Sequence, residues 1–297
     1  MARIIPFLLC IPILASAAQT FRFPPTHLAL AEPVVREILE CRFDNALRIT
    51  DSAYAASADI RPIAAVLHLT ALGMRDIDFD TAIDPAAFVR SFERAQAAIG
   101  RYESAHGITS YSATLRGFAL GIHASYHLKN KSYRTAGVSG LDAVKAMREA
   151  KELDSTNVEA NFFLGLYDYA KTELRRRLRW VLFWYPGSKE DGIRLLEEGA
   201  QGATVTRAAA LLALSDIYLK ENQPRRSREI VFNLKRELPQ SRFVLWAEAK
   251  YYEDQKMHVH AARIYGTLAD MYANEPHGAR NAAATRKKQT EMQRKVR

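Results

Sequence analysis

The sequence is poor in cysteine, and this limits how the fold can be stabilised. Only two of its 297 residues are cysteines, Cys10 and Cys41, and Cys10 lies inside an apolar N-terminal stretch. If that stretch is removed on export, Cys41 is left alone and the chain has no internal disulfide. We therefore expect the fold to be held by packing, with Cys41 as a small buried hydrophobic residue.

The usual catalytic signatures are also missing. We find no nucleophile elbow, phosphate-binding loop or dinucleotide fingerprint. His123 and His127 have the spacing of zinc ligands on one helix face, but Ala124 stands where the metalloprotease motif carries glutamate. We predict no enzyme activity, no cofactor and no bound metal. A metal-dependent envelope hydrolase that uses the two histidines is kept as an alternative.

An acidic segment, residues 76–84, resembles a calcium-binding loop only in part. Thr81 stands where such a loop needs glycine at its sixth position, and Ala87 where it needs glutamate at its twelfth. We interpret the segment as an acidic turn before a helix that begins near Pro85, because proline favours the first turn of a helix.

Long apolar runs are absent after the N-terminus. Arg3 precedes the apolar residues 4–14, and small residues follow at 15–18, which is the pattern of a secretory signal peptide. The apolar run is too short to span a bilayer. We predict a signal peptide over residues 1–18, cleaved after Ala17 or Ala18, and an exported chain that is soluble in the periplasm or secreted.

The formal net charge of +9 is concentrated at the C-terminus. Residues 280–297 hold seven lysines and arginines against one acid, Glu291. Because no nucleic-acid-binding motif accompanies this tail, we interpret it as a solvated helix end and predict no nucleic-acid partner.

Apolar residues recur at three- and four-residue spacing along the rest of the chain, which is the helical period. The clearest pattern is a pair of helices in which Pro224 begins the second and Pro239 ends it. Small and aromatic residues repeat after 34 residues: Ser215, Tyr218 and Ser227 in the first copy, then Ala249, Tyr252, Ala261 and Tyr265 in the second.

This pattern resembles the tetratricopeptide repeat, a helical hairpin of 34 residues. Leu234 and Leu268 depart from it by replacing a small residue, and Ala273 by replacing a proline. A small residue of the second helix can be followed upstream at steps of 49, 48, 49, 35 and 34 residues: Ala46, Ala95, Ala143, Gly192, Ser227 and Ala261. The three long units carry about fifteen additional residues between their first and second helices, as extended first helices or long turns.

We therefore predict an all-α, right-handed solenoid of antiparallel helix hairpins. Divergent hairpins occupy residues 19–140, repeats similar to the tetratricopeptide repeat occupy 141–275, and residues 276–297 form a basic capping helix or tail.

The resemblance implies a non-catalytic scaffold or adaptor of the cell envelope that binds a protein or peptide partner in a groove. In that family the groove is lined by particular positions of each first helix. They correspond here to Ala209, Leu212, Asp216, Phe243, Trp246 and Lys250, of which we favour Trp246 and Lys250.

One further stretch, residues 175–187, combines four arginines with two tryptophans. We interpret its aromatic residues as core, because aromatic residues at helical spacing are usually buried. A partner site at Arg176, Trp180 and Trp184 is the second interpretation. A weak contact with a membrane surface is the third, and with it a peripheral membrane protein remains an alternative function. The residues leave the oligomeric state open.

Overall fold

The chain folds entirely as helices in the part that the structure describes. A computed structural model describes residues 21–177 and 188–296, with no strand among them. The α-helices are α1 (Pro25–Leu39), α2 (Phe43–Ala56), α3 (Arg61–Asp78), α4 (Pro85–His106), α5 (Ser110–Lys129), α6 (Tyr133–Leu153), α7 (Asn161–Arg177), α8 (Lys189–Gly202), α9 (Arg207–Lys220), α10 (Pro224–Glu237), α11 (Arg242–Asp254), α12 (His258–Ala273) and α13 (Ala279–Arg294). A short 3₁₀ turn, η1 (Val158–Ala160), precedes α7.

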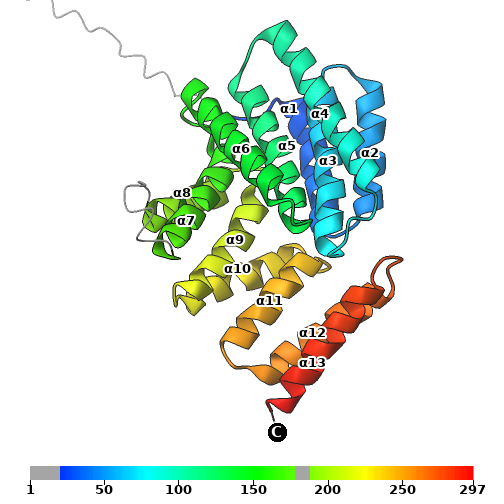
Figure 1. Cartoon of the computed structure of the whole chain (residues 1–297), viewed down its shortest axis with the longest axis vertical. Helices are drawn as coiled ribbons and strands as arrows, with labels where there is room; N and C mark the ends of the chain where they lie inside the picture. Colours follow the sequence, from blue (N-terminus) through cyan, green and yellow to red (C-terminus); the bar gives the residue numbers. More distant parts are fainter. Residues whose placement is uncertain (1–20, 178–187, 297) are drawn as a thin grey trace, which may run out of the picture.

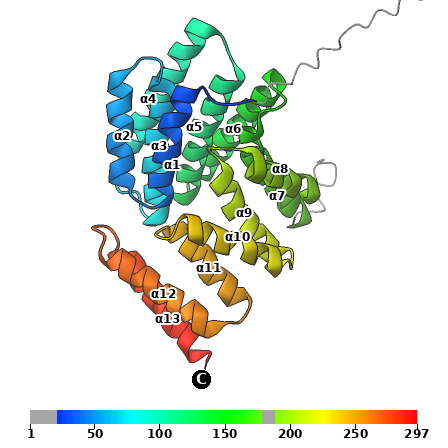
Figure 2. The same cartoon turned by 180° about the vertical axis from the view of Figure 1, so that it is seen from behind.

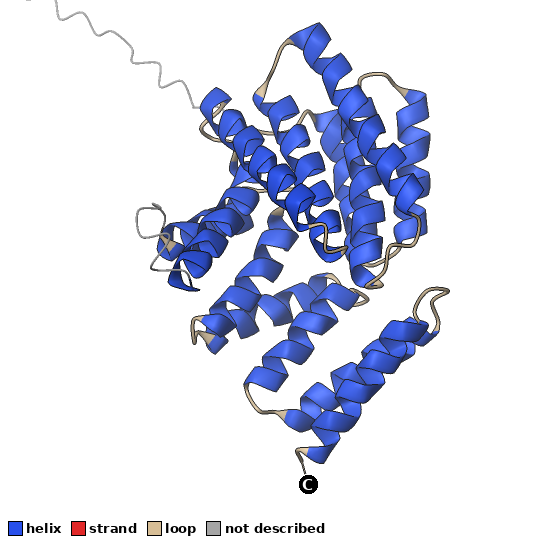
Figure 3. Cartoon of the chain, in the orientation of Figure 1, coloured by secondary structure: helices blue, strands red, loops and turns tan. Residues whose placement is uncertain are grey.

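Consecutive helices pack as six hairpins, α1/α2 through α11/α12, and α13 lies against α12. First helices also contact the first helices of neighbouring hairpins, as α1 does with α3, α3 with α5, and α9 with α11. Figures 1 and 2 show the hairpins formed by α1 to α6 at one end and α13 at the other. Figure 3 shows helices and loops and no strand in the described residues. The predicted all-α, solenoid-like arrangement is confirmed.

The small residues that define the repeat all fall on second helices. Ala46, Ala95, Ala143, Gly192, Ser227 and Ala261 lie on α2, α4, α6, α8, α10 and α12 respectively. Each is buried. Close packing of two helices requires small side chains at the crossing, because ridges of one must enter grooves of the other. The periodicity therefore places the hairpins correctly along the whole chain.

A close crossing joins α7 to α8. A side chain at Gly165 would put its Cβ 2.7 Å from the carbonyl oxygen of Gly192, and a Cβ at Gly192 would lie 2.7 Å from the amide nitrogen of Tyr169. Backbone atoms cannot give way as a flexible side chain can. These two helices therefore meet backbone to backbone, and only glycine fits at the contact.

The sequence led us to expect that the additional residues of the long units extend the first helices or form long turns. In the structure they lengthen both helices of a hairpin instead. In α3/α4 and α5/α6 both helices are longer than in the later hairpins: α4 has 22 residues and α6 has 21, against 14 in α10. Ala95 lies ten residues after Pro85, whereas Ser227 lies three residues after Pro224. Lengthening both partners keeps their apolar faces paired, which a loop would not. In the third long unit the connection, 178–187, lies outside the described residues.

Helix ends follow the local signals. The Ser188 side chain accepts a hydrogen bond from the Asp191 amide at the start of α8, and the Asp84 carboxylate accepts one from the Ala87 amide at the start of α4. Such caps satisfy amides that have no partner inside the helix. The last helix begins at Ala279 and buries only Thr285 and Met292. It leaves a polar outer face, as expected of a terminal cap.

Candidate partner-binding site

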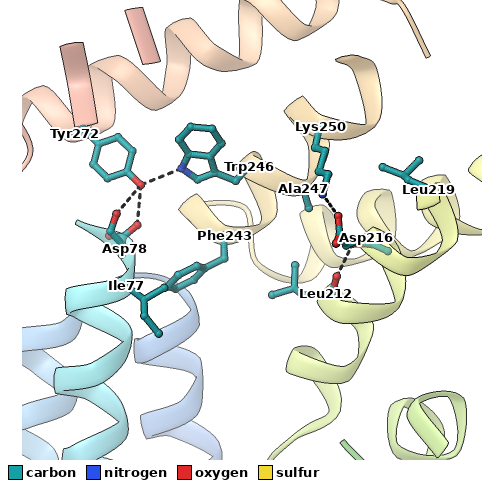
Figure 4. A pocket seen from close by; sticks show the side chains of 11 residues that line it. Ile77, Asp78, Leu212, Asp216, Leu219, Phe243, Trp246, Ala247, Lys250 and Tyr272 are labelled. Atoms are coloured by element: carbon teal, nitrogen blue, oxygen red, sulfur yellow. Dashed lines mark hydrogen bonds and ion pairs between the residues drawn. The ribbon is translucent and has the colours of Figure 1, made fainter. Parts of the chain in front are cut away.

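A pocket of about 320 Å³ lies where α9 and α11 meet the end of α3. Figure 4 shows side chains converging on it from these helices and from Tyr272 on α12. Its lining residues are Ile77, Asp78, Leu212, Ser215, Asp216, Leu219, Phe243, Trp246, Ala247, Lys250 and Tyr272. The C-terminal end of α3, in the second hairpin, thus closes one side of a groove between the fifth hairpin (α9/α10) and the sixth (α11/α12).

The structure brings five of the nine residues named from the sequence together in this pocket: Leu212, Asp216, Phe243, Trp246 and Lys250. Ala209, predicted with them, lines a neighbouring cavity instead. Arg176 belongs to the last turn of α7, and its side chain is not among those described. Trp180 and Trp184 lie outside the described residues, as does the predicted signal peptide.

Charged groups stand on the outer side of the pocket. Lys250 on α11 forms an ion pair with Asp216 on α9 (Figure 4), and Lys220 binds the other oxygen of the same carboxylate at 2.7 Å. The Lys250 side chain is 54% exposed. The pair therefore remains accessible to a ligand that enters the pocket.

A chain of hydrogen bonds fixes the opposite wall. The indole nitrogen of Trp246 donates to the hydroxyl of Tyr272 at 3.0 Å, and that hydroxyl donates to the Asp78 carboxylate at 2.9 Å. Burial, together with the negative charge of Asp78, raises the pKa of Tyr272, so the phenol keeps its proton. These contacts hold Trp246 in one orientation along the wall of the pocket, in T-shaped contact with Tyr265.

Behind this wall lies a buried ion pair that sequence reasoning missed. The guanidinium of Arg242 donates to Asp78 Oδ2 at 2.8 and 2.6 Å and to Glu275 Oε1 at 2.6 Å. The side chains of Arg242 and Asp78 are 3% and 1% exposed. Burial raises the pKa of Asp78, and its hydrogen bonds to Arg242 oppose that shift.

The interpretation of residues 76–84 as an acidic turn is therefore wrong for Asp78. Asp76 and Asp78 are buried in the last turn of α3, and the turn proper begins only after them. Asp78 is 164 residues from Arg242. No local pattern indicates such a contact, because it depends on how the solenoid curves.

His123 and His127, the residues of the alternative hydrolase, contact each other. Their Nε2 atoms lie 3.1 Å apart, and His123 Nδ1 lies 2.8 Å from the hydroxyl of Ser139. The His123 ring also stacks on Phe92 at 4.0 Å. Among the described residues, no three histidines, cysteines or acids gather where they could hold a metal ion. The contact between His123 and Ser139 joins α5 to α6.

The described part of the basic C-terminal helix has local partners. Arg286 forms an ion pair with Asp270, and Lys288 lies 3.7 Å from Glu253. No helix among the described residues is both long enough and apolar enough to cross a membrane. Cys41 is buried, and burial raises the pKa of its thiol to about 12, as suits a core residue.

Because the comparisons with known proteins found no match, the function of the chain has to be inferred from its own structure. No family model, curated protein or solved structure matches it.

Proposed function

We propose that this chain is a non-catalytic adaptor of the bacterial cell envelope that binds an extended segment of a protein partner. One observation carries the proposal. Five residues chosen from the repeat pattern, on helices 34 residues apart, line a single pocket. In the tetratricopeptide repeat, to which we assign the C-terminal hairpins, the corresponding face binds peptides.

The chemistry of the pocket suits a peptide with one bulky apolar side chain and a charged neighbour. Phe243, Trp246 and Leu212 supply an apolar floor, and partly buried tryptophan is among the residues that most often dominate interface energies. Asp216 and Lys250 offer one charge of each sign at the rim. Rim charges of this kind orient a partner more than they add affinity.

The purified processed chain, used as bait on an envelope fraction, tests the proposal. We expect Trp246→Ala to lose the captured partner, with a loss of roughly thirtyfold in affinity, and Lys250→Glu, at the rim, to weaken capture less. Tyr133→Ala on α6 is the matched control, because this aromatic side chain is 66% exposed and does not line the pocket. Unchanged capture by both pocket variants, with circular dichroism showing them folded, would contradict the proposal.

Export is the second part of the proposal and has its own test. Residues 1–18 have the composition of a signal peptide. N-terminal sequencing of the mature protein should begin at Ala18 or Gln19. Recovery of the chain in the cytoplasm with its first residues retained would contradict the proposed location in the cell envelope. It would not bear on the proposal that the pocket binds a partner.

A further inference from the structure

His123 and His127 do not line the candidate pocket, and they lie four residues apart on one face of α5. Their Nε2 atoms are 3.1 Å apart, whereas the centres of the two rings are 4.4 Å apart. The rings therefore approach each other with their Nε2 corners. Both residues are partly exposed, so a small ion in solution can reach the two nitrogens.

The distance between the two nitrogens fits two ligands of a single metal ion. Histidine nitrogens bind zinc at about 2.0–2.1 Å. Two nitrogens at that distance from one ion, and 3.1 Å from each other, subtend an angle of about 100° at the ion. This angle lies between the right angle of a square-planar site, which Cu²⁺ prefers, and the wider angle of a tetrahedral site. Because both ligands belong to one helix, the backbone already holds them at this distance.

Neighbouring side chains hold the two rings in this arrangement. Ser139 on α6 places its hydroxyl 2.8 Å from His123 Nδ1, and Phe92 on α4 stacks on the same ring at 4.0 Å. Tyr126 contacts the ring of His127 edge-on. A neutral ring carries its proton on either nitrogen, so both rings can present Nε2 to an ion with the proton at Nδ1. A hydrogen-bond partner at the far nitrogen usually accompanies a metal-binding histidine, because it fixes the tautomer and the orientation of the ring.

We propose that His123 and His127 bind one divalent transition-metal ion through their Nε2 atoms, with Cu²⁺ bound most tightly. Imidazole suits such ions, and copper has the highest place in their order of affinity for nitrogen ligands. The described residues bring no third histidine, cysteine or acid to the pair, so water fills the remaining positions of the ion. The sequence predicted no bound metal, because spacing alone shows neither the distance between the two nitrogens nor the contact with Ser139. Binding of the ion is independent of the peptide pocket.

Calorimetric titration of the processed chain, stripped of metal with EDTA and then freed of the chelator, tests the proposal. The titrants are the chlorides of Cu²⁺, Ni²⁺, Zn²⁺ and Mg²⁺ at neutral pH. We expect one Cu²⁺ per chain, weaker binding of Ni²⁺ and Zn²⁺, and none of Mg²⁺, which prefers oxygen ligands. Pulsed electron paramagnetic resonance of the copper-loaded chain should show two imidazoles on the ion.

Two substitutions separate the ligands from the residue that orients them. Ser139→Ala keeps both imidazoles and removes only the hydrogen-bond partner of His123, so it should weaken Cu²⁺ binding by roughly tenfold. His127→Ala removes a ligand and should weaken binding by more than that, with a single imidazole left in the resonance spectrum. His127→Gln also removes the imidazole, keeps a polar side chain, and takes its place if the alanine variant does not fold.

His106→Ala on α4 is the matched control. His106 is exposed and also stacks on an aromatic ring, that of Tyr102, but it does not belong to the pair. This variant should bind Cu²⁺ as the parent chain does. No binding of Cu²⁺ by the parent chain, or binding by a folded His127 variant as tight as that of the parent, would overturn the proposal. A spectrum of the parent chain with fewer than two imidazoles on the ion would overturn it as well.

Discussion

Asp216 and Lys250 stand at the same position of consecutive hairpins, 34 residues apart, and form an ion pair across the candidate pocket. The repeat thus places opposite charges on neighbouring first helices, where they face each other. Because Lys250 is 54% exposed and Asp216 is 32% exposed, the pair contributes little to folding. We infer that its main effect is on ligands at the pocket.

The first prediction concerns that pair. Lys250→Glu puts two like charges in contact and should lower the free energy of unfolding by no more than about 1 kcal/mol. Adding Asp216→Lys restores opposite signs at the two positions but places a second cation beside Lys220, so it should recover only part of that loss, measured by urea unfolding of the single and double variants. A loss of several kcal/mol in the single variant would mean that the pair is a structural element and not a surface contact.

The second prediction concerns the buried pair behind the pocket. Arg242→Met leaves Asp78 buried without its cation and should cost about 3–5 kcal/mol of stability. Removing both charges, with Arg242→Met and Asp78→Leu together, should cost less than Arg242→Met alone, because no uncompensated charge remains. Urea unfolding with linear extrapolation measures both.

Arg207→Met is the matched control for Arg242→Met. Arg207 pairs with Glu237 at 2.9 Å, but their side chains are 42% and 46% exposed. We expect a loss of about 1 kcal/mol at most. Similar losses in the Arg207 and Arg242 variants would show that burial does not set the strength of these pairs.

Local patterns predicted the hairpins because each hairpin is stabilised by nearby residues. Small residues at 34- to 49-residue steps fall on second helices, and Pro224, Asp84 and Ser188 mark where helices begin. The same reasoning found five residues of the pocket, since repeat positions correspond from one hairpin to the next. It could not find the residues that close the pocket, Ile77 and Asp78. They come from a hairpin far away in the sequence, and only the curvature of the solenoid brings them close.

The third prediction concerns the close approach of α7 and α8. Gly165→Ala puts a methyl group within 2.7 Å of the Gly192 carbonyl, so the helices must separate, and we expect a loss of roughly 2–4 kcal/mol. Gly137→Ala is the control, because no atom lies within 4 Å of its added Cβ and it is exposed on α6. That change should stabilise the chain by about 0.5–1 kcal/mol. Equal effects of the two substitutions in thermal unfolding would argue against backbone contact at Gly165.

The fourth prediction concerns acid stability. Burial, followed by the nearby His127, lowers the pKa of His123 to about 4 from its usual value near 6.5. Between those values the unfolded chain binds a proton at this residue that the folded chain does not. Stability from this group is therefore present above pH 6.5 and is lost as pH falls toward 4.

The free energy of unfolding of the parent chain should fall as the pH is lowered from 6.5 to 4. We expect His123→Gln to reduce that fall by roughly 1–2 kcal/mol, a range that allows for the partial exposure of the ring. His123 Nδ1 lies 2.8 Å from the Ser139 hydroxyl in the parent chain, and the glutamine amide can donate to or accept from the same hydroxyl. A pH profile of the variant parallel to that of the parent would contradict the assigned shift.

Photocrosslinking tests most directly whether the inner face of the solenoid receives the partner. A photoreactive phenylalanine is placed in the processed chain at Leu212 or Phe243 on first helices, and at Glu229 or Val259, exposed on second helices. After exposure to an envelope fraction and light, the two inner positions should link the same protein and the two outer positions should not. Links from Glu229 or Val259 to that protein, with none from Leu212 or Phe243, would place the partner on the outer surface and contradict the account.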